Sequence, residues 1–401
     1  MGFWSKGAFD DRGDRHGRRP VFLACVSLFA LGSVVIALAP SFAVLLLGRA
    51  IQGVGGGGII PTASAVIGDS LSAGRRARAL GLMGATYGMA FVLGPPLAAV
   101  LMLAFSWQWI FLANVPIAAA VLLFGARSLP NRRHGVPLAP LDAGGIALLT
   151  LLLTLLVLGI TRAWAGDVWP WLLVGALPVG VLLVRHQRRV EARGGRPMVP
   201  VSLFSLRQLR LTYSLTLGAG FGMGAIVFLA TLATQAHAVD RSHVGFALLP
   251  MVLASMVGSM GSARALARVG TRAVVASGFG FLVLGYFGVA WVGLGFTGYL
   301  LASVPVGLGV GVAVGGALRS LALDESPVTL RGAAQGLVNI FTSIGTLLAV
   351  SVMGSVADLA GGGVAGLSLA YESVAVLMLG MTAAAWALRE PGLRNEMAGA
   401  A

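Results

Sequence analysis

Long apolar runs, separated by short polar or arginine-rich breaks, constrain this chain of 401 residues more than any other feature. There are about twelve of them, each close to the ~20 residues that a helix needs to cross a hydrocarbon core about 30 Å thick. Hydrophobic residues make up 57% of the chain and charged residues only 10%. The runs are continuous, whereas barrel strands would alternate, and a helix bonds all its own backbone groups in lipid. We therefore expect an all-α polytopic membrane protein.

The predicted membrane spans divide into two sets of six. The first set covers residues 20–39, 42–66, 79–103, 107–126, 143–161 and 168–184. The second set covers residues 211–234, 244–262, 272–292, 297–318, 333–356 and 369–388. An even number of spans predicts that both termini of the chain lie on the same side of the membrane.

The arginines predict which side that is, because basic residues in short loops stay in the cytoplasm. With cytoplasmic termini, all but three of the 28 lysines and arginines fall in cytoplasmic segments, the exceptions being Arg49, Arg162 and Arg241. The net charge of +14 is then a result of topology. A nucleic-acid-binding protein would gather basic and aromatic residues on one soluble face, so no nucleic-acid partner is expected.

The sequence lacks the residue patterns of disulfides, metal sites, phosphate-binding loops and catalytic sites. Cys25 is the only cysteine, and the five histidines are dispersed without carboxylates at ligand spacing, so neither a disulfide nor a metal site is expected. The glycine run at 53–58 lacks the Lys-Ser/Thr pair of a phosphate-binding loop. No serine, histidine and acid grouping indicates catalysis. We expect neither an enzyme nor a bound cofactor.

A charged run, DRHGRRP, immediately precedes the first predicted span. It resembles the signature between the second and third helices of major facilitator superfamily transporters, where an aspartate and arginines latch the cytoplasmic gate. The usual glycine four positions before the aspartate is replaced by Asp10. The matching residues are Asp14, Arg15, Gly17, Arg18 and Arg19.

A second motif lies within the next span. Arg49, Gln52, Gly53 and Gly55 fit the pattern R-x-x-Q-G-x-G and resemble the fourth-helix motif of the same superfamily. A cation in a membrane helix costs roughly 2.5 to 3.5 kcal/mol on insertion scales, which favours a role in ion or substrate handling. The resemblance implies that Arg49, Gln52 and Gly53 serve transport and proton coupling. The alternative is that Arg49 only reaches out to the outer interface.

The span at 79–103 carries glycines at spacings that let two helices approach closely. Together with a proline, they resemble the fifth-helix signature of antiporters, although Ala98-Ala99 replaces the usual glycine pair. The matching residues are Gly84, Gly88, Gly94 and Pro95. Methionines and aromatic residues nearby and in the second half predict an adaptable apolar cavity for hydrophobic or cationic molecules. The candidate lining residues are Met83, Tyr87 and Phe91, with Phe221 and Met223 further along.

Residues 107–116 narrow the resemblance to one branch. Trp107, Trp109, Phe111, Asn114 and Pro116 resemble the start of the sixth helix in the fourteen-span drug:proton antiporters, although both tryptophans also suit interfacial anchors. The spans at 143–161 and 168–184 fit the two extra helices of that branch. The chain would then hold family helices three to fourteen and lack the first two.

The resemblance implies a domain layout of five segments. These are a cytoplasmic lead-in with the gate motif (1–19), the rest of the N-terminal bundle with four spans (20–130), the inserted helix pair with a basic linker (131–209), a C-terminal six-helix bundle (210–388) and a cytoplasmic tail (389–401).

The expected function is export of drug-like, hydrophobic or cationic molecules across a bacterial inner membrane in exchange for protons, by a monomer that alternates its access. The proton gradient would be the only energy source. All fourteen acidic residues fall at predicted helix ends or in loops, so Asp69, Asp358 and Glu372 are weak candidates for the proton carrier. Two alternatives stay open: a truncated protein without transport activity, and a metabolite exporter without proton coupling.

Overall fold

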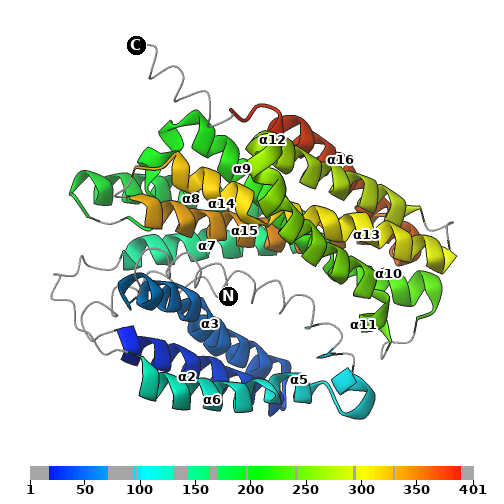
Figure 1. Cartoon of the computed structure of the whole chain (residues 1–401), viewed down its shortest axis with the longest axis horizontal. Helices are drawn as coiled ribbons and strands as arrows, with labels where there is room; N and C mark the ends of the chain where they lie inside the picture. Colours follow the sequence, from blue (N-terminus) through cyan, green and yellow to red (C-terminus); the bar gives the residue numbers. More distant parts are fainter. Residues whose placement is uncertain are drawn as a thin grey trace. The chain divides into compact units, whose positions relative to one another are not determined.

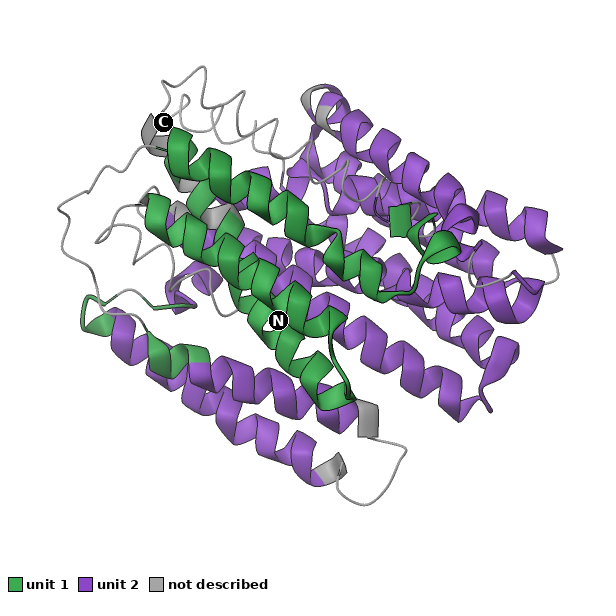
Figure 2. Ribbon diagram, turned by 90° about the horizontal axis from the view of Figure 1, so that it is seen from below, with its two compact units in different colours: residues 1–87, 97–146, 192–198 green, residues 88–96, 147–191, 199–401 purple. Residues whose placement is uncertain are grey.

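The computed structural model describes residues 18–70, 94, 97, 98, 100–129, 142–162, 169–195, 197–239, 243–291, 295–327 and 330–389. The elements in these ranges are all helical. The chain forms two compact units, distinguished in Figure 2. The first unit comprises residues 1–87, 97–146 and 192–198, and the second comprises residues 88–96, 147–191 and 199–401.

Figure 1 shows the helices with their labels. The first unit holds α2 (Arg18–Ala37), α3 (Phe42–Ser70), α5 (Gln108–Leu112) and α6 (Asn114–Ser128), and α7 (Ala143–Arg162) begins in it and continues into the second. The second unit holds α8 (Trp169–Ala192), η1 (Val201–Ser205), α9 (Arg207–Ala225), α10 (Val227–His237), α11 (Val244–Ala247), α12 (Leu249–Ala290), α13 (Gly295–Ala313), α14 (Gly316–Asp324), α15 (Arg331–Leu359) and α16 (Gly363–Ala385).

In the described part of the chain, ten helical segments are long and apolar enough to cross a membrane. They correspond to ten of the predicted spans. Of the other two, the span at 79–103 lies almost wholly outside the described residues, and the span at 168–184 is the apolar part of α8, whose last turns are rich in arginine. The prediction of an all-α multi-pass membrane protein is confirmed.

In the first unit, α2 and α3 form a hairpin that packs through glycines. A Cβ on Gly32 would overlap the backbone nitrogen of Gln52, and a Cβ on Gly55 would overlap the backbone nitrogen of Phe29. Small residues at such positions let membrane helices approach closely. This contact brings the side chains of α2 within hydrogen-bonding reach of α3.

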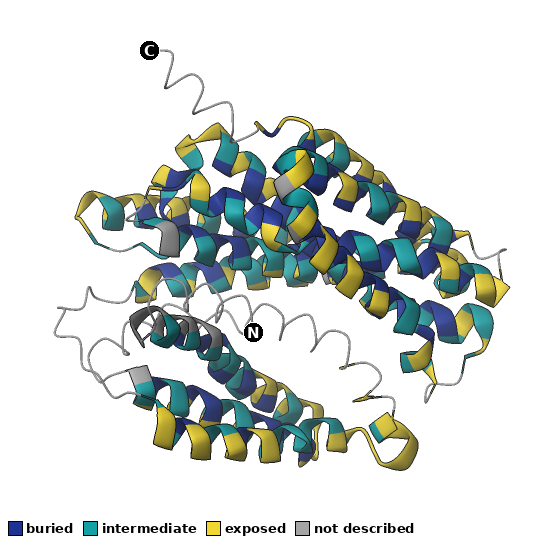
Figure 3. Ribbon diagram, viewed as in Figure 1, coloured by how far each residue is buried: buried dark blue, intermediate teal, exposed yellow. Residues whose placement is uncertain are grey.

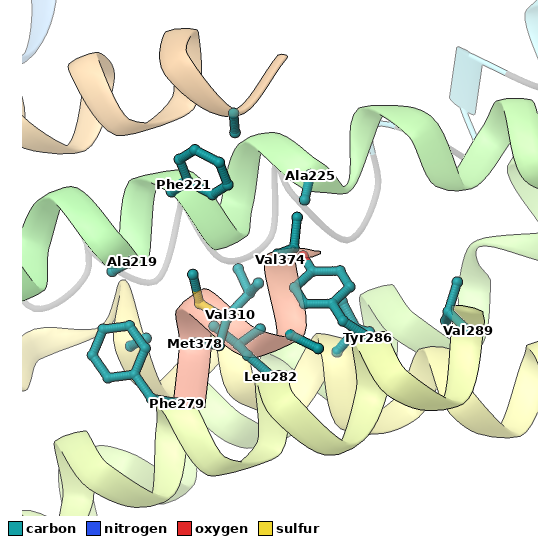
Figure 4. Close-up of a cluster of buried hydrophobic side chains, with 14 of the residues drawn as sticks. Ala219, Phe221, Ala225, Phe279, Leu282, Tyr286, Val289, Val310, Val374 and Met378 are labelled. Atoms are coloured by element: carbon teal, nitrogen blue, oxygen red, sulfur yellow. The ribbon is translucent and has the colours of Figure 1, made fainter. Parts of the chain in front are cut away.

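The second unit is built around one hydrophobic core. Its buried side chains come from every helix from α9 to α16, and Figure 3 shows buried faces on these helices beside exposed ones. In Figure 4, Phe221 of α9 lies in this cluster with Leu282 of α12 and Met378 of α16. Only 7% of Phe221 is exposed. Phe221 therefore packs helices together, as a core residue, and does not line an open cavity within this unit.

Backbone contacts through glycine also join the helices of the second unit. A Cβ on Gly307 of α13 would overlap the carbonyl oxygen of Met251 on α12, and one on Gly220 of α9 would overlap that of Thr342 on α15. The Thr342 hydroxyl donates to the backbone carbonyl of Val338, and the two oxygens are 2.7 Å apart. The two helix pairs are thus in contact along their backbones, which larger side chains would prevent.

One helix of the second unit is interrupted. Between α9 and α10, the amide of Ile226 donates to the carbonyl of Met223 at 3.3 Å, and the amide of Leu229 donates to that of Ile226 at 3.0 Å. Both bonds reach back three residues, whereas an α-helix reaches back four. This tightened turn lies inside the span Arg207–His237, where there is no bulk water to bond displaced carbonyls.

Three buried tyrosines supply hydrogen bonds around this turn. Each donates its hydroxyl to a backbone carbonyl of α9 or α10. The bonds run from Tyr286 to Gly222, from Tyr371 to Ala225 at 3.2 Å and from Tyr299 to Leu229 at 3.2 Å. The tyrosines come from α12, α16 and α13, so the turn is held by three different helices.

We expect the substitution Tyr286→Phe to lower the stability of the protein, because it leaves a carbonyl of the interrupted helix without its donor. The cost should be about 1 to 3 kcal/mol. Tyr213→Phe is the matched control, because Tyr213 is equally buried but its hydroxyl has no hydrogen-bond partner among the described residues. Melting temperatures of the purified variants in detergent, followed by tryptophan fluorescence, provide the measurement. Equal shifts for both variants would contradict this role for Tyr286.

Candidate functional site

Arg49 lies on α3 and interacts with two side chains of the first unit. Its Nη1 donates to Oε1 of Gln52, one turn further along, at 3.2 Å. Its guanidinium carbon lies 4.7 Å from the centre of the Phe111 ring of α5, within the range of a cation–π interaction. Arg49 is seven residues into the candidate span Phe42–Ile59, or about 10 Å along the helix axis.

Gln52 is anchored in turn by α2. Its Nε2 donates to the hydroxyl of Ser33 at 2.9 Å, and Nδ2 of Asn114, at the start of α6, donates to the same oxygen at 3.4 Å. The Ser33 hydroxyl donates to the carbonyl of Phe29 at 3.0 Å. Ser33 is fully buried and Gln52 is 8% exposed. A hydroxyl offers one donor and two acceptor positions, so Ser33 uses all three.

These bonds fix which way the Gln52 amide points. Because the Ser33 proton is committed to Phe29, the Ser33 oxygen can only accept, and Gln52 must turn its NH2 group toward it. The carbonyl oxygen of Gln52 then faces Arg49, which can only donate. Ser33 therefore acts as a positioning residue for the guanidinium, although it does not touch it.

Among the described residues, most N–H groups of the Arg49 guanidinium make no hydrogen bond. A guanidinium has five N–H groups and stays protonated. In the described part of the chain, Gln52 is its only hydrogen-bond partner, no carboxylate pairs with it, and its side chain is exposed. A permanent cation in a membrane helix can bind an anionic group or stabilise the ionised form of a nearby acid.

Replacing Ser33 by alanine should release this network. The amide groups of Gln52 and Asn114 would lose a buried acceptor, which should cost about 1 to 3 kcal/mol of stability. Ser303→Ala is the control, since Ser303 is also fully buried and, among the described residues, its hydroxyl bonds only to the carbonyl of Leu300. Arg49 should also react faster with phenylglyoxal in Ser33→Ala than in the control, as measured by peptide mass spectrometry. Unchanged reactivity would show that Ser33 does not position Arg49.

The described residues include only part of the predicted sites. Arg18 and Arg19 of the gate motif are the first residues of α2, and Gly53 is a half-buried residue of α3. Gly94 is helical, and a Cβ there would meet no atom within 4 Å. The other predicted residues lie outside the described residues: Asp14, Arg15, Gly17, Met83, Gly84, Tyr87, Gly88, Phe91 and Pro95.

The second unit contains a segment whose importance the sequence interpretation missed. Arg268, Gly270 and Arg272 repeat the spacing of the arginines and glycine in the gate motif. Gly270 has φ 80° and ψ 169°, a non-helical conformation that kinks α12 near the start of the candidate span Arg268–Ala290. The guanidinium of Arg272 lies 4.5 Å from the ring centre of Trp386. A search for internal repeats would have found this segment.

Arg319 lies in a helical span, not in the loop where it is predicted. It was expected in a cytoplasmic loop after a span ending at residue 318, but the helical span continues through α14 to Asp324. There Nη2 of Arg319 donates to Oδ1 of Asn339 on α15 at 3.0 Å, and Nε2 of Gln335 donates to the carbonyl of Arg319 at 2.7 Å. The prediction ended the span at the first charged residue, which is too early because the charge has polar partners.

The position of Glu372 needs a similar correction. A predicted span at 369–388 put it near a span end, but α16 begins at Gly363, so Glu372 is nine residues, or about 14 Å, into the helix. Its side chain is exposed, on the face that carries Val376 and Leu379. An ionisable residue at this depth is a functional candidate by default. Asp69 and Asp358, in contrast, are the penultimate residues of α3 and α15.

Comparison with known proteins identifies the family. The sequence profile of the Major Facilitator Superfamily matches residues 12–350. The chain belongs to this superfamily. Its members are transporters and not enzymes, so the expectation of a transport protein is confirmed at the level of the family.

Curated relatives of this superfamily protein include two from Bacillus subtilis (strain 168). The uncharacterized MFS-type transporter YfiU is 34% identical over 350 residues, which are 84% of this chain and 66% of YfiU. The multidrug transporter protein MdtP is 27% identical over 350 residues, 86% of this chain and 64% of MdtP. The chain thus spans about two thirds of the length of these relatives.

Solved structures agree on the fold. A crystal structure of the nucleoside transporter NupG superposes with a TM-score of 0.65 over 97% of this chain and 88% of NupG, at 13% sequence identity. At that identity the likeness concerns the arrangement of helices alone. The superfamily helical bundle is therefore the fold of this chain.

Proposed function

We propose that this protein is a secondary active transporter that exports hydrophobic or cationic small molecules from a bacterial cell in exchange for protons. It would act as a monomer in the inner membrane, with the termini of this chain in the cytoplasm, and use the proton gradient as its energy source. The observation that carries the proposal is the buried polar network that holds the cation Arg49 in a membrane helix, where none of the described carboxylates pairs with it.

Two further observations support the drug-export part of this proposal. Relatives at 27 to 28% identity include the multidrug transporter protein MdtP and multidrug resistance protein 3 of Bacillus subtilis (strain 168). The helices also carry few charges and many apolar and small residues, which suit an apolar or cationic substrate better than a sugar or a phosphate.

The order of the helices supports assignment to the fourteen-span antiporter branch. Helices α7 and α8 follow α6 and precede α9, the position of the extra pair in that branch. We assign α2 to the third helix of the family and α3 to the fourth. The gate role of Asp14 and its neighbouring arginines, and the antiporter role of the glycines near Gly88, remain proposals from the motifs.

Coupling to protons needs a carboxylate that gains and loses a proton within the membrane. Among the described carboxylates, Glu372 lies deepest in a candidate span. We assign Glu372 the role of proton carrier, and we assign Arg49, in the first unit, the separate role of a fixed cation.

The Glu372→Gln variant should lose proton-driven efflux, because an amide cannot carry the proton. Everted vesicles containing the variant should clear ethidium no faster than vesicles without the protein when a proton gradient is applied. Asp358→Asn, which changes a carboxylate at the end of α15, should leave efflux near its original rate. Normal coupled efflux by Glu372→Gln would remove this residue from the mechanism.

The decisive test of the proposed function uses the unmodified protein. Ethidium efflux from preloaded cells should require the protein and should stop when an uncoupler collapses the proton gradient. Efflux that continues after the collapse would indicate an exporter without proton coupling. Efflux absent for ethidium and for a panel of hydrophobic cations would contradict the drug-export proposal.

A further inference from the structure

One face of α8 is exposed from Trp171 to the end of the helix and is apolar as far as Leu182. Its exposed residues recur every three or four positions, which places them on one side of a helix. More than half of each of these side chains is exposed: Trp171, Val174, Leu177, Val181 and Leu182. In a membrane protein, such a stripe meets the acyl chains of lipids.

The same face becomes cationic in the next turns. Arg185 follows Val181 by one turn, and Arg188 and Arg189 follow by another, and all three are exposed. They lie about 21 to 27 Å along the axis from Trp171, close to the thickness of the hydrocarbon core. A tryptophan at one end and arginines at the other suit the two interfaces. The arginines therefore lie where lipid headgroups begin, on the side of the helix that faces lipid.

The opposite face of α8 is covered by the protein's own loop. Gln187 is 1% exposed and accepts a hydrogen bond from the backbone nitrogen of Val199 at 3.2 Å. Glu191, the only acid in α8, accepts from the backbone nitrogen of Ser202 at 3.4 Å and from its hydroxyl. The loop at 199–202 thus hydrogen-bonds to Gln187 and Glu191, on the side of α8 opposite the exposed arginines.

The three arginines have no such partner. In the part of the chain that the structure describes, none of them makes a hydrogen bond or pairs with a carboxylate. We propose that Arg185, Arg188 and Arg189, the α8 arginine face, bind the phosphate of an anionic phospholipid such as phosphatidylglycerol. Guanidinium groups match phosphate oxygens with paired hydrogen bonds, and the adjoining apolar stripe accommodates the acyl chains. This inference is independent of the transported compound.

Native mass spectrometry of the purified full-length chain in detergent tests the proposal. The probes are phosphatidylglycerol and, for comparison, zwitterionic phosphatidylcholine. The variant Arg185→Gln/Arg189→Gln should bind phosphatidylglycerol about 30-fold more weakly, given the usual attraction of two basic residues to anionic lipid. Its affinity for phosphatidylcholine should not change.

The variant Arg207→Gln/Arg210→Gln is the matched control. It also removes two exposed arginines, but they lie at the start of α9, whose exposed face continues to Ser214 and then becomes buried. Phosphatidylglycerol affinity should stay within about twofold of the original. An equal loss of affinity in both variants would overturn the proposal, because removing any two arginines would then have the same effect. The proposal would also be overturned if the unmodified protein bound phosphatidylglycerol no more tightly than phosphatidylcholine.

Two further arms separate the remaining outcomes. The variant Arg185→Lys/Arg189→Lys keeps the charges and should retain most of the lipid preference, whereas a loss caused by misfolding would lower the melting temperature and affect both lipids. Millimolar inorganic phosphate should fail to displace the lipid. Full displacement by free phosphate would show a site for soluble anions and would refute a lipid site.

Discussion

Replacing Arg49 with alanine should lower proton-driven ethidium efflux by about 10- to 150-fold, the factor expected when a hydrogen-bonded charge is removed. The variant should still insert and fold, because Arg49 is exposed and only one residue of the network, Gln52, depends on it directly. Initial efflux rates from ethidium-loaded cells, normalised to the amount of protein in the membrane, provide the measurement.

The controls for Arg49 separate charge from geometry. Arg49→Lys keeps the charge but loses the planar group that lies over Phe111, so it should recover only part of the rate. Gln52→Leu keeps Arg49 but removes its hydrogen-bond partner, and its efflux rate should lie between those of Arg49→Ala and Arg49→Lys. If Arg49→Ala transported normally, the polar network would be a packing device and the proposed function would lose its main support.

The largest expected loss of stability comes from Gly307→Ala. A Cβ at this position would overlap the carbonyl oxygen of Met251, which belongs to the backbone of α12 and cannot rotate away. The helices would have to separate, at a cost of about 3 kcal/mol or more for overpacking a tight contact. The melting temperature in detergent should fall clearly, or the variant should fail to accumulate in the membrane.

Gly280→Ala is the matched control for this prediction. Gly280 is a helical glycine of α12, and a Cβ there would meet nothing within 4 Å. Alanine favours a helix over glycine by about 1 kcal/mol, so this variant should be as stable as the original or more so. Similar melting temperatures for the two variants would mean that α12 and α13 are not in backbone contact at Gly307.

The sequence predicted the helices well because the signal is local. An apolar run of about twenty residues determines a membrane helix without help from distant parts of the chain. Arg49 and Gln52 of the fourth-helix motif are in contact, which their spacing favours, since two residues three apart on a helix share one face. The apolar character of α8 was predicted as well, and only its extension as a helix to Ala192 was not.

What the sequence could not predict depends on contacts between distant residues. Ser33 lies 19 residues from Gln52, and Asn114 lies 81 residues from Ser33, so no local pattern joins them. The depth of Glu372 was missed for a different reason. Apolar residues continue on both sides of it, and a hydropathy pattern places a span's boundaries only within several residues.

The tyrosine bonds at the interrupted helix have a consequence for biosynthesis. The carbonyls of Gly222, Leu229 and Ala225 receive their donors from residues that are made 64, 70 and 146 positions later. During synthesis, α9 and α10 are therefore made before the three helices whose tyrosines donate to them. The full set of three tyrosine bonds can form only after α16, the last of these helices, has been synthesised.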